Sequence, residues 1–161
     1  MTEKINGFKA AVAAVIAALT ALWGWFGWLV IAWAGCMALD YITGSAAACR
    51  AGEWSSQTAR DGLWHKAGCI AAVLISGILD IVIGLVIANI PSVSLPFTYT
   101  VFLCPLVLVW YILTEVGSII ENAGRMGAPI PAWLANAVSA LKSGVDKTGD
   151  KLGGGEDKEK E

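Results

Sequence analysis

The sequence predicts an all-α integral membrane protein with about three transmembrane helices, an N-terminal Ala-rich helix and a short C-terminal amphipathic helix. Of its 161 residues, 57% are hydrophobic and 15% are charged, whereas soluble domains have about 25% charged residues. The run 67–90 has thirteen Ile, Leu or Val side chains and one charged residue, Asp80. A helix of this run would be about 36 Å long, enough to cross a hydrocarbon core of ~30 Å. The apolar side chains, at roughly −0.3 to −0.6 kcal/mol each, outweigh one buried carboxylate at roughly +2.5 to +3.5 kcal/mol.

The N-terminal region carries no charge from Ala10 to Leu39, which is too long for one straight span and too short for two spans with a turn. A Trp- and Gly-rich segment at 23–28 interrupts this run, and aromatic residues prefer the membrane interface. We therefore predict an Ala-rich helix over 5–22, a break, and a second helix over 28–41. The sequence leaves open whether the first helix spans or lies in the interface, and on which side the N-terminus lies.

The rest of the chain continues the helical pattern. A polar loop over 40–66 precedes the helix at 67–90, and a short uncharged turn at 90–96 precedes a helix over 97–120 that Pro105 is expected to kink. A strict amphipathic pattern then predicts a short interfacial helix over 132–143. These elements form one membrane domain over 1–143. The Gly-rich, charged segment 144–161 is expected to be a disordered cytoplasmic tail.

Membrane topology follows from the Lys and Arg residues in the loops. The segment 40–66 has three, the turn 90–96 has none, and the chain after Asn122 has six. Cytoplasmic loops carry the excess of positive charge. The 40–66 loop and the C-terminus are therefore predicted to be cytoplasmic and the 90–96 turn external.

Two carboxylic acids, Asp80 and Glu115, lie within apolar helices, and no Lys or Arg lies between Lys66 and Arg125. We expect neither acid to have a cation partner in its own chain, so each is a neutral interhelical group, a pore-lining group or part of a proton relay. Ser118 and Asn122 lie on the same helix face as Glu115 and are assigned the same pore-lining or interhelical role. A three-span monomer cannot enclose a water path, so functional acids require a homo-oligomer.

Small residues recur at every fourth position of the 67–90 helix, on the face that also carries Asp80. In membranes, such a face lets helices approach closely, so it is predicted to pack against other helices. The residues are Gly68, Ala72, Ser76, Gly84 and Ala88.

The sequence contains no catalytic constellation. It has no GxSxG, P-loop or HExxH motif and only one His, so an enzyme is not expected. The four Cys residues are dispersed without a CxxC pair, so no metal site is predicted. We expect no cofactor and no nucleic-acid partner.

Two sequence blocks resemble a known family. The first is Asp40-Tyr41-Ile42-Thr43-Gly44 with Ser55-Ser56 and Gly62-Leu63, and the second is EVGSIIEN at 115–122 followed by Pro129-Ile130-Pro131. Together they are similar to the toxin-secretion/phage-lysis holin family. The predicted family-motif residues of the 40–66 loop are Asp40, Tyr41, Thr43, Gly44, Ser55 and Ser56. The long Ala-rich start and Val116-Gly117 depart from the family pattern.

The resemblance implies a bacteriophage or prophage protein that oligomerises in the bacterial cytoplasmic membrane. It would open timed, non-selective lesions that release an endolysin, which is a cell-wall hydrolase, or a toxin. Its partners would be other copies of itself and the bilayer, without necessary direct contact with the released protein. An alternative stays open from the residues alone: a small oligomeric ion or proton channel, or a transporter subunit, that uses Asp80 and Glu115.

Overall fold

The computed structural model describes residues 7, 9–10, 13–14, 24–90 and 101–152. It contains four long helices: α2 (Trp25–Ala51), α3 (Ser56–Asn89), α4 (Leu103–Arg125) and α5 (Ala132–Leu152). Helices α2, α3 and α4 are each long and apolar enough to cross a membrane. The predicted all-α class and the three membrane-spanning helices are therefore confirmed. The helix predicted over 5–22 falls largely outside the described residues.

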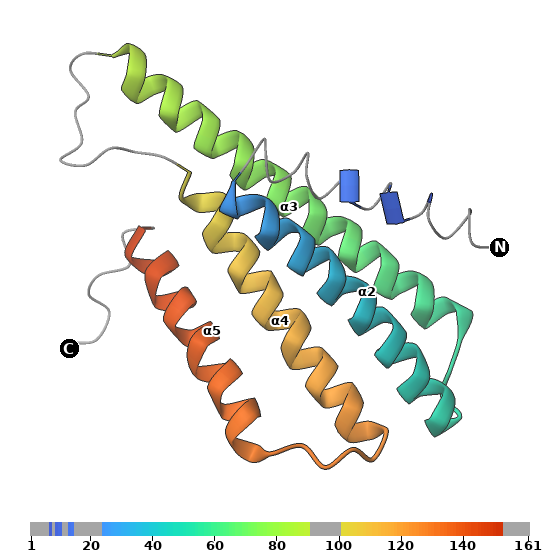
Figure 1. The fold of residues 1–161 in the computed structure, drawn as a ribbon. Coiled ribbons are helices and arrows are strands. Elements are labelled where there is room, and N and C mark those ends of the chain that lie inside the picture. Colours follow the sequence, from blue (N-terminus) through green and yellow to red (C-terminus); the bar gives the residue numbers. More distant parts are fainter. Residues whose placement is uncertain (1–6, 8, 11–12, 15–23, 91–100, 153–161) are drawn as a thin grey trace.

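Helix α4 is the centre of the bundle. Helices α2, α3 and α5 all pack against it, whereas α2 and α3 make little contact with each other (Figure 1). Every residue of α4 from Leu103 to Ile120 is buried or partly buried. The core is a small cluster contributed by three helices, and its members are Trp33, Cys69, Val73, Cys104 and Leu108.

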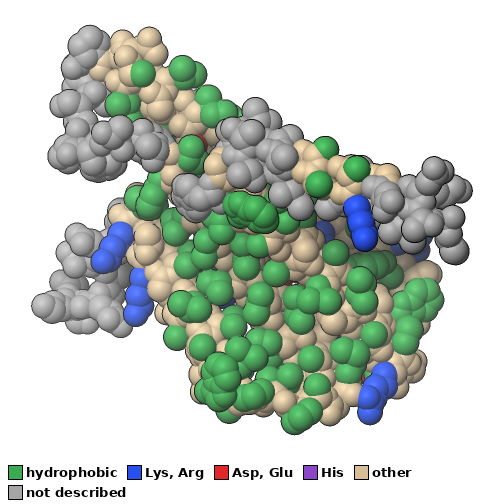
Figure 2. All heavy atoms as spheres, viewed as in Figure 1, with side chains coloured by type: hydrophobic (Ala, Val, Ile, Leu, Met, Phe, Trp, Pro, Cys, Tyr) green, Lys and Arg blue, Asp and Glu red, His purple; other side chains and the backbone are tan. Residues whose placement is uncertain are grey.

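The outer surface of the bundle is largely apolar. Figure 2 shows hydrophobic side chains spread over this face, with Lys and Arg at its edges. Helix α3 alone exposes nine large aliphatic side chains from Ile70 onwards. An exposed apolar surface of this extent is unfavourable in water but suits contact with lipid chains. The nine residues are Ile70, Leu74, Ile75, Ile78, Leu79, Ile81, Val82, Leu85 and Val86.

The predicted 40–66 loop is wrong, because most of it is helical. Helix α2 continues ten residues past the predicted end at 41, and α3 begins eleven residues before the predicted start at 67. Asp40, Tyr41, Thr43 and Gly44 therefore lie in α2, and a turn of four residues, 52–55, remains. Polar residues can stay helical near the membrane surface, because backbone hydrogen bonds inside a helix form whatever the side chain is.

Both ends of this turn are capped by local sequence. Gly52 has a φ of 71° and ends α2, with hydrogen bonds from the Gly52 and Glu53 N–H groups to the carbonyls of Cys49 and Ala48. This is a Schellman arrangement, in which the left-handed position favours glycine. Ser55 is the N-cap of α3, and its hydroxyl accepts a hydrogen bond from the Thr58 N–H at 3.1 Å. The family-motif residue Ser55 thus has a capping role.

The last two helices also differ from their predicted ranges of 97–120 and 132–143. Helix α4 begins six residues later, at Leu103, so Pro105 lies in its first turn, where proline is tolerated, and the predicted kink is wrong. Helix α5 extends nine residues beyond its predicted end. Residues 144–152 are therefore helical, because the amphipathic pattern continues into the segment predicted as a disordered tail. The remainder of that tail, 153–161, lies outside the described residues.

Candidate functional site

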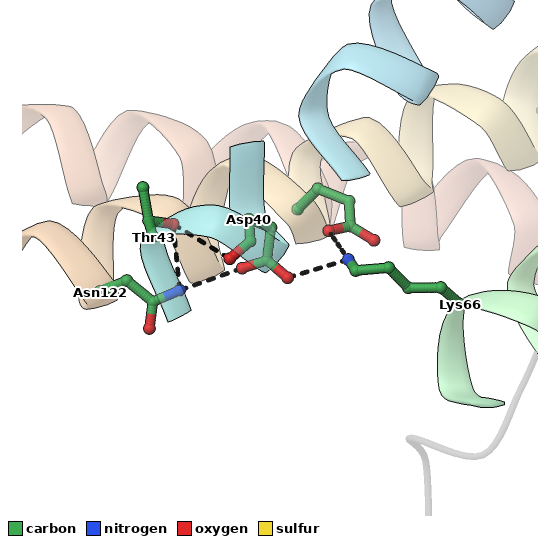
Figure 3. Close-up of polar contacts among 5 residues, drawn as sticks. Asp40, Thr43, Lys66 and Asn122 are labelled. Carbon is green, nitrogen blue, oxygen red and sulfur yellow. Dashed lines mark hydrogen bonds and ion pairs between the residues drawn. The ribbon is translucent and has the colours of Figure 1, made fainter. Parts of the chain in front are cut away.

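Lys66 connects the three membrane-spanning helices at one buried point (Figure 3). Its Nζ, on α3, donates to Oδ2 of Asp40 on α2 at 2.9 Å and to Oε2 of Glu115 on α4 at 2.6 Å. The exposed side-chain fractions are 12% for Lys66, 20% for Asp40 and 7% for Glu115. The expectation that Glu115 has no cation partner in its own chain is therefore wrong.

Asn122 extends this arrangement by two helical turns towards the end of α4. Its Nδ2 donates to Oδ1 of Asp40 at 3.1 Å and to Oγ1 of Thr43 at 3.4 Å. The Thr43 hydroxyl donates to the Asp40 carbonyl at 3.1 Å. A Cβ at Gly44 would lie 3.4 Å from Asn122 Nδ2, so the absence of a side chain there allows the close approach of α4. We call Asp40, Thr43, Lys66, Glu115 and Asn122 the polar cluster.

The polar cluster lies well inside the helices. Asp40, Lys66 and Glu115 are ten or eleven residues from the ends of their helices at the two turns, which is about 15 Å along each axis. An isolated charge at the centre of a bilayer costs roughly 2.5–3.5 kcal/mol on insertion scales. Mutual pairing offsets this cost, and removal of one partner leaves the others uncompensated. The cluster is therefore suited to holding α2, α3 and α4 together.

A polar cleft of about 510 Å³ leads from the turns to the polar cluster. Its deeper lining includes Asp40, Lys66, Asn122 and Ser118, a predicted site residue. Ser118 is partly buried. The cleft lies where α2 and α3 contact each other little, so water can approach the cluster from that end.

Two arginines tie the turns together around the cleft. Arg125 Nη2 lies 3.2 Å from Glu53 Oε2, although both side chains are half-exposed or more. Arg50 Nη1 donates to the Met126 carbonyl. The Arg50 guanidinium also lies against Gly127, whose φ of 90° favours glycine. The α2–α3 turn and the α4–α5 loop therefore lie at the same end of the bundle.

Asp80 stands apart from the polar cluster and caps α4. Its Oδ1 accepts the N–H groups of Phe102 at 3.2 Å and Leu103 at 2.9 Å, and its Oδ2 accepts that of Cys104 at 2.7 Å. The first N–H groups of a helix have no partner within the helix and favour a negative charge. Asp80, which is only 4% exposed, supplies the acceptor oxygens for these N–H groups, because the N-cap residue of α4 makes no side-chain cap of its own.

The small-residue face of α3 divides between two environments. Ser76 and Asp80 are buried against α4, and Ala72 is partly buried. Gly68 and Ala88 are exposed, and among the described residues no atom lies within 4 Å of a Cβ built at Gly84. Gly77, outside the predicted set, would place its Cβ 3.6 Å from Cys104 Sγ. Packing within the chain thus uses the middle of this face, and its two ends stay available.

Helix α5 joins α4 through a contact that sequence analysis missed. Trp110 Nε1 donates to Asp146 Oδ1 at 2.6 Å, and Lys142 Nζ lies 4.4 Å from the centroid of the Trp110 ring. The cation over the indole face is a favourable electrostatic contact. A signal was present in the sequence, since Lys142 and Asp146 are four residues apart on one helix face.

The polar side chains described above pair with one another or cap a helix. Within the described ranges no group of three His, Cys, Asp or Glu side chains is placed to hold a metal ion. The acids are used in an ion-pair cluster and in a helix cap, so neither is arranged as a general acid or base beside a substrate cavity.

Comparisons with known proteins agree with this description. The model of the bacteriophage holin family matches residues 17–143. An uncharacterized protein of Halalkalibacterium halodurans is 36% identical over 111 residues, which cover 69% of this chain and 76% of the relative. No solved structure matches significantly. Holins are membrane pore-forming proteins without enzymatic activity, and they generally oligomerise and work with endolysins. With its three membrane-length helices and a family match over most of its length, the chain belongs to the bacteriophage holin family.

Proposed function

We propose that this protein assembles in the bacterial cytoplasmic membrane and, at a set time, opens non-selective lesions that release an endolysin or a toxin. The observation that carries this proposal is the family match over residues 17–143 in a chain with three membrane-length helices. The protein acts without catalysis, and its working partners are other copies of itself and the lipid bilayer. The toxin-secretion role is the finer part of this proposal and follows from the motif blocks at 40–44 and 115–122.

We assign the end of the bundle that holds both turns to the cytoplasm. Arg50 and Arg125 lie at this end, and positive charge is enriched on the cytoplasmic side of membranes. Residues 90–96 are then external. In an intact membrane α5 carries too many charges to cross alone, so the C-terminus is also cytoplasmic at this stage.

The polar cluster holds α2, α3 and α4 together as one unit in the membrane. One lysine from α3 pairs with acids from α2 and α4, so separation of any of these helices leaves a charge unpaired at membrane depth. Asp80 and Glu115 act as interhelical groups within the chain, and Ser118 and Asn122 line the cleft that brings water towards the polar cluster. Copies associate through the ends of the small-residue face at Gly68, Gly84 and Ala88.

The proposal is tested by inducible expression in a bacterium that also produces a cytosolic wall hydrolase. We expect growth to continue while the protein accumulates and then culture turbidity to fall abruptly. Cells with the hydrolase alone, or with the chain alone, serve as the two controls and should not show this pattern of wall loss. Continued growth after full accumulation in the membrane would contradict the proposal.

The family match does not favour the alternative of a small ion or proton channel. That alternative requires Asp80 to bind and release the transported ion. Asp80 instead accepts three backbone N–H groups at the start of α4, a role that the Asp80→Asn variant can keep in part.

A further inference from the structure

Helix α5 has one face that packs along α4. Its partly buried residues recur every three or four positions, as expected for a single contact face. These residues are Leu134, Val138, Lys142, Val145 and Gly149. The hydrogen bond from Trp110 to Asp146 fixes this contact near the start of α4. Because the α4–α5 loop lies at the opposite end of α4, α5 runs antiparallel along most of that helix (Figure 1).

The exposed side of α5 carries a continuous polar stripe, and its member Ser139 also borders the groove between α4 and α5. Its residues are spaced by three or four along the helix, and each is exposed. The stripe contains one basic and one acidic residue, so it has no net charge. Its members are Asn136, Ser139, Ser143, Lys147 and Asp150. We call this set the α5 polar stripe.

The position of α5 is difficult to reconcile with lipid on all sides. The 21 residues of α5 give a length of about 31 Å, close to the ~30 Å of a hydrocarbon core. Helix α5 is nevertheless absent from the helices that are apolar enough to span a membrane. Lys147 and Asp150 lie five and eight residues beyond the midpoint of α5, where a charge that faces lipid costs less than the roughly 2.5–3.5 kcal/mol of the bilayer centre but is still unfavourable. The stripe needs water beside it when α5 lies along α4.

Within the described residues, neither the second half of α3 nor α4 from Leu103 to Ile120 offers a comparable water-facing surface. The exposed side chains in the second half of α3 are large and aliphatic, and α4 is covered from Leu103 to Ile120. A wall between bilayer and water must be apolar on one side and polar on the other, which is the pattern of α5. A stripe without net charge would also favour neither cations nor anions.

We propose that α5, packed along α4 as in the structure, forms the water-facing wall of the lesion through the α5 polar stripe. This inference rests on the proposed function, because it names the element that lines the opening. In an intact membrane α5 lies on the cytoplasmic surface, with its apolar residues in the interface and its lysines among the headgroups. Lesion opening then brings α5 across the bilayer, where the polar stripe contacts water.

The experiment uses the full chain, with its four native cysteines replaced by Ala, in liposomes that contain fluorescent dextran. Single spin labels are placed at three exposed residues at the start, middle and end of α5: Trp133, Leu141 and Leu152. A label at Ser143 reports on the polar stripe, and one at Leu74 on α3 is the lipid-facing control. Accessibility to oxygen and to a water-soluble nickel chelate gives the depth of each label, and dextran efflux is measured for every labelled chain.

In vesicles that release dextran, we expect the oxygen-to-nickel ratio to be several-fold higher at Leu141 than at Trp133 and Leu152. The label at Ser143 should remain accessible to the nickel chelate, whereas that at Leu74 should not. Ala140 is the second midpoint position if a label at Leu141 prevents efflux. Equal, shallow depths along α5 in leaking vesicles would overturn the role of α5 and leave lesion formation standing. Absence of efflux from every chain, the unlabelled one included, would contradict the proposed function itself.

Discussion

Lys66 on α3 and Glu115 on α4 form an ion pair with 2.6 Å between Nζ and Oε2, in a part of the chain that spans the membrane. Asp40 on α2 shares the same ammonium group. Glu115 is therefore paired within its own chain and does not need a cation from another copy. This relationship makes the three spanning helices one unit and gives the variants below their expected effects.

Substitution of Lys66 by Met should destabilise the chain by about 3–5 kcal/mol, because two carboxylates lose their shared cation in a buried site. The measurement is the midpoint of denaturant-induced unfolding in mild detergent. Arg60→Met, at an exposed position of the same helix, is the matched control and should have little effect. Combining Lys66→Met with Asp40→Asn and Glu115→Gln should recover much of the loss, since no charge is then left unpaired. Equal effects of Lys66→Met and Arg60→Met on the unfolding midpoint would show that the polar cluster does not hold the three helices together.

Asp80→Ala should expose the first turn of α4 to exchange, because three N–H groups lose their acceptor. We expect a loss of about 1–3 kcal/mol, as for other buried donors that are left unsatisfied. Hydrogen exchange of the segment 101–106, followed by mass spectrometry, reports this directly. Asp80→Asn retains an acceptor oxygen and should keep both the cap, in weakened form, and lesion activity. Complete loss of activity in Asp80→Asn would instead support an ion-carrying role.

Gly84→Leu should weaken cross-linked oligomers without preventing membrane insertion, since no atom of the described residues lies within 4 Å of a Cβ at this position. Gly77→Leu is the informative comparison, because its side chain would meet Cys104 within the same chain and should lower the stability of the monomer. Cross-linking in isolated membranes separates the two effects. If Gly84→Leu left the cross-linking pattern unchanged, this face of α3 would have no part in assembly.

Trp110→Phe removes the indole N–H that binds Asp146 while keeping an aromatic ring near Lys142. We expect faster hydrogen exchange in α5 with little change in α2, because the substitution loosens only the α4–α5 contact. Trp133→Phe, at a residue that is 69% exposed, provides the control. An unaltered exchange rate in α5 would show that this hydrogen bond does not hold the helix in place.

Much of the fold follows from hydrophobicity alone. Three long apolar segments interrupted by turn residues were sufficient to predict three membrane-spanning helices. Helix ends were less predictable, because Asp40 and Lys66 look like loop residues when charge is used to end a span. Capping by Gly52 and Ser55 shows that the helices continue through these charges to a turn of four residues.

The partners of the two acids were missed for a geometric reason. A hairpin centred on 90–96 places Asp80 opposite Val107 and Glu115 opposite Ala72. Helix α4 begins six residues later than predicted. Asp80 therefore contacts the start of α4 at Cys104, three residues from Val107, which the hairpin places at the same depth. Glu115 binds Lys66, six residues from Ala72, which the hairpin places at the same depth. The long lysine side chain covers part of the distance between positions 66 and 72 of α3. A search of the sequence for the cation nearest to Glu115 in the hairpin would therefore have found Lys66.

The most direct test of lesion formation is simultaneous release from liposomes that contain the purified full chain, a potassium indicator system and a folded wall hydrolase. We predict that potassium and active hydrolase leave the vesicles in the same event once the protein density exceeds a threshold. Vesicles with an equal density of an unrelated three-span protein should retain both. Potassium release with complete retention of the hydrolase, or no release at any density, would contradict the account.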